Sequence, residues 1–217
     1  MDVNAVIWDL DGVILDNELL HIDAEIDTLS SLGIPLTREI ALEYLGVRLT
    51  DYFRDIRTRF QVQVPLPQML ERHHATLTHY YGEVFPLTAH LLEVLERLSG
   101  KYLLGLATNR ERDLAERALT RFSLKIYFHT MLFGEDVKKG KPDPELYLKA
   151  AKNLGVVPAV CTAVEDTGPG FTAAKNAGMT VIARRAEHNR HIDFSIADHI
   201  VEDLREIPGA VKQLRRR

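Results

Sequence analysis

Two aspartates, Asp9 and Asp11, directly follow an apolar run in the stretch AVIWDLDGVILDNE, and Gly12 comes after them. Two carboxylates about 4 Å apart repel each other by roughly 4 kcal/mol at an effective dielectric constant of about 20. At neutral pH such a pair is tolerable only when a proton or a cation lies between the two groups. Because the candidate ligands are all oxygens, the expected cation is a hard ion, and we expect Mg²⁺.

Polar residues follow three further apolar runs. In chain order these are YLLGLA (102–107) with Thr108 and Asn109 after it, TMLF (130–133) with Lys141 in the loop beyond it, and AVCTAV (159–164) with Glu165 and Asp166 after it. Taken singly, each of these residues is also typical of an ordinary turn or helix start. Ligands bind beyond the carboxyl ends of the strands in an open parallel sheet, so we expect these loops to meet at one edge. Mg²⁺ sites are often completed by phosphate oxygens, which predicts a phosphorylated substrate beside Lys141 and Thr108.

The apolar runs themselves predict a parallel sheet. There are five of them, namely AVIW (5–8), the three runs named above and TVIA (180–183). Runs this short and this apolar are typical of strands that are buried on both faces. The last four alternate with the helix-like segments ERDLAERALTRF, DPELYLKAAKNLG and FTAAKNAG. This alternation indicates a doubly wound, Rossmann-like α/β sheet.

The long stretch between the first two runs predicts helices and no strand. The signals are Ile22, Ile26 and Leu29 at helical spacing behind Asp16 or Asn17 as the cap, further helix starts at Thr37 and Thr50, and a helix over 65–81. An amphipathic helix within 85–100 then leads to the second strand. We therefore expect a helical cap domain, residues 16–84, inserted into a core domain made of residues 1–15 and 85–217.

Composition narrows the class of protein. The chain has 217 residues, of which 46% are hydrophobic and 27% charged, and its formal net charge is -4. These values are typical of an ordinary globular protein and give no general attraction to nucleic acid or to an anionic membrane. The single cysteine, Cys161, lies inside an apolar run and predicts a reducing compartment. We expect a cytoplasmic monomer or weak dimer with no nucleic-acid or membrane partner.

Taken together, the motifs resemble the haloacid dehalogenase-like hydrolase superfamily, in the branch with a helical cap. That branch includes sugar-phosphate phosphatases, phosphoglycolate phosphatases and β-phosphoglucomutase. The resemblance rests on WDLDGVILDNELLH, LATNR, GKPDPELYLKAAKNLG and AVEDTGPGFTAAKNAGM, which occur in the family's order. It covers essentially the whole chain and implies an α/β core with one cap, Mg²⁺ as the cofactor and a small phosphate ester as the substrate.

The resemblance also implies a role for each residue that follows a strand. Asp9 would be the nucleophile that forms an aspartyl-phosphate, and Asp11 would protonate the leaving oxygen and then accept a proton from water. The remaining roles are Asp9, Asp166 and the backbone carbonyl of Asp11 as ligands of Mg²⁺, Glu165 as a ligand or as a partner of the ion's waters, and Thr108, Asn109 and Lys141 on the phosphoryl group.

Several cap residues are candidates for contact with the substrate. Gly46 and Arg48, in YLGVRLTDYF, match a cap loop that faces the active site in relatives. Arg48 would bind an anionic or hydroxyl-rich leaving group, and the alternative is an exposed arginine at a helix start. Glu18 and His21 follow the nucleophile on the first predicted cap helix, where an acid near a helix N-terminus and a half-buried histidine are the alternatives. Other histidines lack the spacing of ligands and are expected at the surface, namely His73, His74, His79, His188 and His191.

Three functions are compatible with these residues. The first is a Mg²⁺-dependent phosphatase of a small phosphorylated metabolite, a sugar phosphate or a related acid. A phosphomutase would use the same core but return the phosphoryl group from Asp9 to a second hydroxyl. A protein that only binds a phosphometabolite would have no use for Asp11 as a proton carrier. The superfamily's dehalogenases lack an acid at that position, which argues against dehalogenation.

Overall fold

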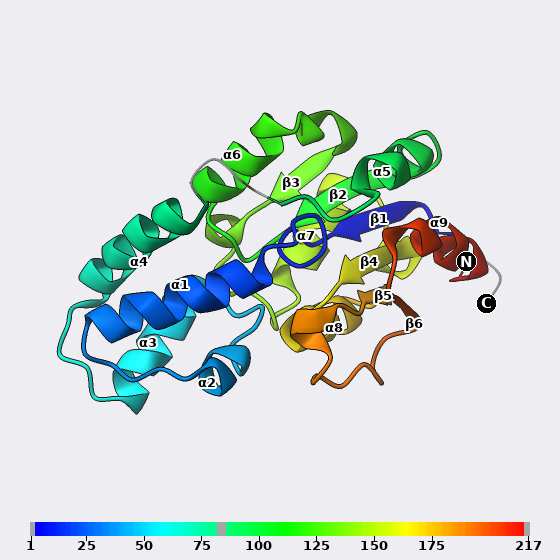
Figure 1. Cartoon of the computed structure of the whole chain (residues 1–217). Coiled ribbons are helices and arrows are strands. Elements are labelled where there is room, and N and C mark those ends of the chain that lie inside the picture. The colour runs from blue at the N-terminus through cyan, green and yellow to red at the C-terminus, as the bar shows by residue number, and fades with distance from the viewer. Residues whose placement is uncertain (1–2, 82–85, 215–217) are drawn as a thin grey trace.

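The computed structural model of the chain describes residues 3–81 and 86–214 (Figure 1). Its centre is a parallel sheet with the strand order β3-β2-β1-β4-β5-β6. The strands are β1 Ala5–Trp8, β2 Leu103–Ala107, β3 Thr130–Leu132, β4 Cys161–Glu165, β5 Thr180–Arg184 and β6 His199–Val201. The first strand of the sequence therefore lies in the middle of the sheet, between β2 and β4, and the predicted doubly wound α/β fold is confirmed.

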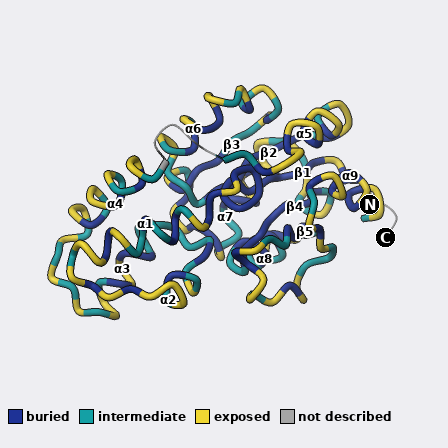
Figure 2. The backbone as a smooth tube through the Cα atoms, in the orientation of Figure 1, coloured by how far each residue is buried: buried dark blue, intermediate teal, exposed yellow. Residues whose placement is uncertain are grey.

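The sheet is covered on both faces, as its apolar strands require. Alternate residues of a strand point to opposite faces. Val6 and Trp8 pack with α5 Leu91–Ser99, α6 Arg112–Arg121 and α9 Ile207–Leu214. Ala5 and Ile7 pack on the other side with α7 Glu145–Asn153 and α8 Gly168–Asn176. Figure 2 shows β1 and β4 as buried tubes between these helical layers.

Four helices form a second unit, called the cap from here on, beside the carboxyl ends of the strands (Figure 1). They are α1 Glu18–Ser31, α2 Arg38–Leu42, α3 Leu49–Arg59 and α4 Leu66–Tyr81. Their apolar faces bury a core of their own, in which Ile22 and Leu29 of α1 contact residues such as Phe53 and Met69. Because Ile22 and Leu29 lie two turns apart on one helix face, their sequence spacing already indicated this packing.

Two chain segments join the helical unit to the sheet, and they lie side by side. The backbone N–H of Asp16 donates to the Pro86 carbonyl at 2.8 Å, and that of Thr88 donates to the Ile14 carbonyl at 3.0 Å. The predicted domain boundary at residues 84 and 85 lies outside the described residues. The division of the chain into a core and a cap domain stays a prediction.

Element boundaries differ from the sequence predictions in a few places. The third cap helix begins at Leu49 behind Arg48, and not at Thr50, whereas Thr37 caps α2 as predicted by accepting a hydrogen bond from the Ile40 N–H. The edge strand β6 was not predicted, because it is three residues long and half exposed, so it lacks the apolar run of the inner strands. No helix among the described residues is long and apolar enough to cross a lipid bilayer.

Candidate active site

The loop after β1 begins the site, and a glycine lets it approach β4. The N–H of Asp9 donates to the Val164 carbonyl at 3.0 Å, so Asp9 extends the sheet by one residue. Gly12 then turns the chain with a φ of +70°, and a Cβ atom there would lie 1.9 Å from Oδ2 of Asp166. Arg184, at the end of β5, donates a hydrogen bond to the Gly12 carbonyl. Any side chain at position 12 would push the two acidic loops apart.

Three buried carboxyl groups meet where β1 and β4 end. Asp9, Glu165 and Asp166 each offer one carboxylate oxygen, and these oxygens lie within 4.8 Å of one another. Nζ of Lys141 lies 2.5 Å from Oδ1 of Asp9 and 2.5 Å from Oε1 of Glu165. The hydroxyl of Tyr147, on α7, also donates to Oε1 of Glu165, at 2.6 Å. The structure thus brings Asp9 to the ammonium group of Lys141, which is 132 residues away in sequence.

Burial and charge act on these groups in opposite directions. Burial raises the pKa of Asp9 and that of Asp166, because the charged form of a carboxyl group loses hydration. Burial also disfavours the charged form of Lys141, but the carboxylates of Asp9 and Glu165 outweigh it and hold the pKa of the ammonium above its usual value. With all three carboxyl groups ionised, three carboxylates and one ammonium leave two negative charges in a buried site. A divalent cation would balance them.

One oxygen of Asp166 fits the position of a metal ligand. Its Oδ2 accepts a hydrogen bond from Nε2 of His188 at 2.7 Å, and its backbone carbonyl accepts one from the side chain of Asn189 at 2.8 Å. Its Oδ1 is buried and has no hydrogen-bond partner among the described residues. Buried polar atoms are rarely left unpaired, so this oxygen is available to a cation. An all-oxygen set of this kind fits Mg²⁺.

The loop after β2 connects the site to the cap. Thr108 is buried, and its hydroxyl accepts a hydrogen bond from the Arg110 N–H at 3.1 Å. The side-chain amide of Asn109 accepts from the Lys141 N–H at 2.9 Å and donates to the Gly46 carbonyl at 2.8 Å. Asn109 therefore ties three loops together, one of which belongs to the cap.

Gly46→Ala is expected to lower kcat/KM by roughly ten- to hundredfold, because a displacement of about 1 Å in a site has effects of this size. Gly46 has a φ of +75°, and a Cβ atom there would lie 2.4 Å from Oγ1 of Thr167. The added methyl group would push the cap loop away from the core and weaken its hydrogen bond to Asn109. Steady-state kinetics with p-nitrophenyl phosphate would measure the loss.

The matched control is Gly33→Ala. Gly33 has almost the same φ, +76°, but a Cβ atom there would meet no atom of the described residues within 4 Å, its chain neighbours aside. Both variants carry the left-handed backbone strain of about 1–2 kcal/mol, whereas only Gly46→Ala has the clash. Equal losses of activity in the two variants would contradict a role for close contact between the cap and the core.

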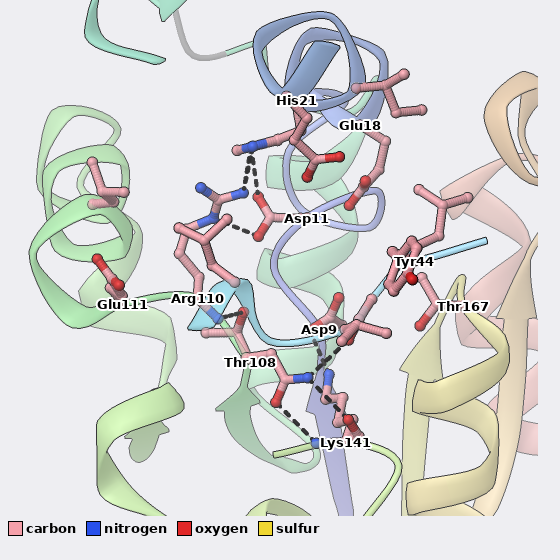
Figure 3. Close-up of a pocket in the computed structure, with 18 of the residues that line it drawn as sticks. Asp9, Asp11, Glu18, His21, Tyr44, Thr108, Arg110, Glu111, Lys141 and Thr167 are labelled. Carbon is pink, nitrogen blue, oxygen red and sulfur yellow. Dashed lines mark hydrogen bonds and ion pairs between the residues drawn. The ribbon is translucent and has the colours of Figure 1, made fainter. Parts of the chain in front are cut away.

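Asp11 is held between the cap and the core (Figure 3). Its Oδ1 accepts a hydrogen bond from the side chain of Asn17 at 2.6 Å, and its Oδ2 lies 2.5 Å from Nε of Arg110. Asn17 precedes α1 without capping it by a side-chain hydrogen bond, because its Oδ1 accepts from the Gly12 N–H at 3.4 Å instead. Arg110 also donates a hydrogen bond to His21 on α1. Sequence reasoning assigned no role to Arg110, although it lies in the quoted motif LATNR.

A cavity opens above these residues, between the ends of the strands and the helices of the cap. It is lined by Asp9, Asp11, Thr108, Asn109 and Lys141 from the core, and by Glu18, His21 and Gly46 from the cap, all of which the sequence singled out. Arg48 lies elsewhere. Its guanidinium group is 2.9 Å from the Asp51 carboxylate and borders a neighbouring depression of the surface.

Two histidines that were expected at the surface are buried, so that expectation was wrong for His73 and His188. His73 lies on α4 between Met69 and Leu77, and all three are buried at a spacing of four residues, which is a pattern that could have revealed it. His188 comes from the loop after β5 and shows no such pattern. His79 and His191 are exposed, as expected, and His74 is half buried.

The chain is similar to proteins of known class over most of its length. The profile of a family described as haloacid dehalogenase-like hydrolase matches residues 6–184. A phosphorylated carbohydrates phosphatase of Thermotoga maritima is 34% identical over 82% of this chain and 82% of its own, and hexitol phosphatase B of Escherichia coli is 33% identical over 94% and 93%. The crystal structure of β-phosphoglucomutase from Clostridium difficile, at 21% identity, has the same fold with a TM-score of 0.85 over 99% of this chain and all of that one. This chain therefore belongs to the haloacid dehalogenase-like hydrolases.

Proposed function

We propose that the protein is a Mg²⁺-dependent phosphatase that hydrolyses a small phosphorylated metabolite, a sugar phosphate or a related compound. The observation that carries the proposal is the Asp9 carboxylate, which lies among the buried oxygens of Glu165 and Asp166 and 2.5 Å from the ammonium group of Lys141. A carboxylate in such surroundings is suited to attack phosphorus. The two similar proteins from Thermotoga maritima and Escherichia coli, which are named phosphatases, support the same reaction.

The residues divide the reaction between them. The Asp9 carboxylate attacks the phosphorus atom, and the bond from phosphorus to the leaving oxygen breaks as an aspartyl-phosphate forms. Asp11 donates a proton to the leaving oxygen and accepts one from the water that then hydrolyses the aspartyl-phosphate. Lys141 and Thr108 hold the phosphoryl oxygens and balance their charge.

Mg²⁺ fits the carboxylates of Asp9 and Asp166, the backbone carbonyl of Asp11, and Glu165 as a ligand or as a partner of the ion's waters. When bound, it supplies positive charge to the transferring phosphoryl group. His188 and Asn189 hold Asp166 from behind, at the distances given above, and keep one of its oxygens turned to the site. Partners of this kind orient a ligand and strengthen its binding to the metal.

A hydrolase fits the cavity better than a mutase does. A mutase that passes through a bisphosphate must hold a second phosphate group, which requires a cation at the end of the cavity away from Asp9. Among the described residues that line the cavity, the permanent cations are Lys141 and Arg110, and each is already paired with a carboxylate. Arg48, the other candidate, faces Asp51.

The same proposal includes a cytoplasmic location. Cys161 is the single cysteine of the chain, and its thiol is free and buried, which suits a reducing compartment.

Removal of divalent cations with a chelator is expected to abolish phosphate release from a panel of phosphorylated metabolites, and added Mg²⁺ is expected to restore it. Binding should also be visible without turnover, as a rise in melting temperature on addition of Mg²⁺. Asp166→Asn should lose most of that rise, because it weakens the charge that holds the ion. Turnover that persists in excess chelator would show that the metal assignment is wrong.

A further inference from the structure

One face of α1 lines the cavity, and it extends from the buried carboxyl groups of the core toward the cap end. Glu18, His21 and Glu25 follow one another at intervals of three and four residues, so they share a face, and all three line the cavity. Glu18 lies close enough to Asp166 and Asp11 for their charges to raise its pKa, after the larger effect of burial. At a rise of 1.5 Å per residue, Glu25 lies about 10 Å further along the helix. A pentitol or hexitol chain in extended form covers a comparable length.

His73, on α4, presents an unpaired acceptor at this far end. Burial lowers its pKa to about 3, so its ring is neutral at physiological pH. The Thr28 hydroxyl donates its hydrogen to the Ala24 carbonyl at 2.7 Å and therefore accepts from Nδ1 of His73, at 3.2 Å. A neutral imidazole that donates from Nδ1 is an acceptor at Nε2. That Nε2 atom is buried and has no partner among the described residues, while the ring lines the cavity.

Glu25, three residues before Thr28 on α1, offers both a donor and an acceptor to the same cavity. Burial raises the pKa of Glu25 to about 8, against the opposing effects of the Tyr52 hydroxyl and the Arg110 charge, so the carboxyl group carries a proton at neutral pH. Tyr52 comes from α3 and is buried, and its hydroxyl has no partner at hydrogen-bond distance among the described residues. The far end of the cavity therefore holds, in Nε2 of His73, a buried polar atom without a partner among the described residues, which is a costly arrangement unless a ligand completes it.

The charges around the cavity decide what that ligand can be. The described cap residues that line it include two acids, Glu18 and Glu25, but no lysine or arginine. A distal carboxylate or second phosphate group would meet no unpaired cation there, whereas hydroxyl groups can donate to Nε2 of His73 and both donate to and accept from Glu25. These charges favour a ligand that is uncharged and rich in hydroxyl groups at this end.

We propose that Glu25 and His73 form a hydroxyl-binding subsite at the cap end of the cavity, which takes the distal part of an uncharged polyol or sugar monophosphate. This inference rests on the proposed function, because it assumes that the phosphoryl group lies at Asp9. It makes Glu25 and His73 residues that determine specificity, and it leaves the chemistry to the core.

Two variants test the subsite with three substrates of different length. Glu25→Met keeps the volume of the side chain but removes its hydrogen bonds, and His73→Asn keeps a donor for Thr28 while it removes the acceptor at Nε2. Each is expected to lower kcat/KM for glucitol 6-phosphate by about tenfold to hundredfold, mainly through KM. Glycerol 3-phosphate and p-nitrophenyl phosphate do not present hydroxyl groups so far from phosphorus, and their kcat/KM should stay within about threefold of wild type.

Controls separate the subsite from structure and from catalysis. Glu25→Gln should retain most of the wild-type kcat/KM, because an amide also donates and accepts. Glu71→Met makes the same change as Glu25→Met on an exposed face of α4, and its kcat/KM should match that of wild type. Equal losses on all three substrates would overturn the subsite, since they would indicate a structural effect.

Binding of glucitol 6-phosphate to Asp9→Asn enzyme, measured by calorimetry with and without Glu25→Met, is independent of turnover. A Kd that Glu25→Met leaves unchanged overturns the subsite, whereas failure of wild-type enzyme to release phosphate from any substrate overturns the proposed function.

Discussion

Asp9→Asn is expected to lower kcat by about four orders of magnitude or more, as the loss of a covalent nucleophile does in other enzymes. The side-chain amide of asparagine does not attack phosphorus, so the covalent intermediate cannot form. Among the described residues, no other carboxylate occupies the position of the Asp9 carboxylate. The variant should remain folded, because asparagine has nearly the shape of aspartate and burial already disfavours the charge at this position. Phosphate release and circular dichroism on the same preparation would measure both effects.

The control for this variant is Asp113→Asn, which makes the same change on the exposed first turn of α6. Its kcat should match that of wild type within about twofold. An Asp9→Asn enzyme that is folded and keeps more than a few per cent of wild-type turnover would refute the nucleophile. The reaction would then have to proceed by direct attack of water on phosphorus.

The sheet and the centre of the site were predictable because their signals are local. A strand buried on both faces must be apolar along its length, so β1, β2, β4 and β5 can be recognised from their sequences. Parallel strands place their carboxyl ends at one edge, and therefore the residues after them converge whatever the loops do. That rule alone places Asp9, Lys141 and Asp166 within reach of one another, as the structure does.

The environment of the site was less predictable, because it depends on contacts between distant segments. Arg110 acquires its position from Asp11 and His21, which belong to a different loop and to the cap. His188 supports Asp166 from a loop without regular structure. The direction of the Arg48 side chain could not be predicted either. The motif gives the position of this residue in the cap, but it does not show that the side chain turns toward Asp51.

Lys141→Met is expected to reduce both stability and catalysis by large amounts. The ammonium group is buried between Asp9 and Glu165, and removal of one partner from such a buried ionic group costs about 3–5 kcal/mol of unfolding free energy. For a chain of this size, that loss corresponds to a fall in melting temperature of roughly 6–20 °C. The phosphoryl group also loses a source of positive charge, which should lower kcat by about 10²- to 10³-fold. Denaturant unfolding and phosphate-release kinetics would measure the two losses.

The pH dependence of this stability loss tests its electrostatic origin. Because the pKa of Lys141 is raised in the folded protein, its stabilising effect is complete below the pKa of a free lysine and does not change between pH 5 and 8. The pKa of Asp9 is also raised, so without the ammonium this group takes up a proton as the pH falls and the repulsion weakens. The difference between wild type and Lys141→Met should therefore shrink from pH 8 to pH 5. Lys139→Met, an exposed neighbour in the same loop, should show neither the loss nor its pH dependence. A loss in Lys141→Met that is equally large at both pH values would mean that lost packing, and not unbalanced charge, destabilises the variant.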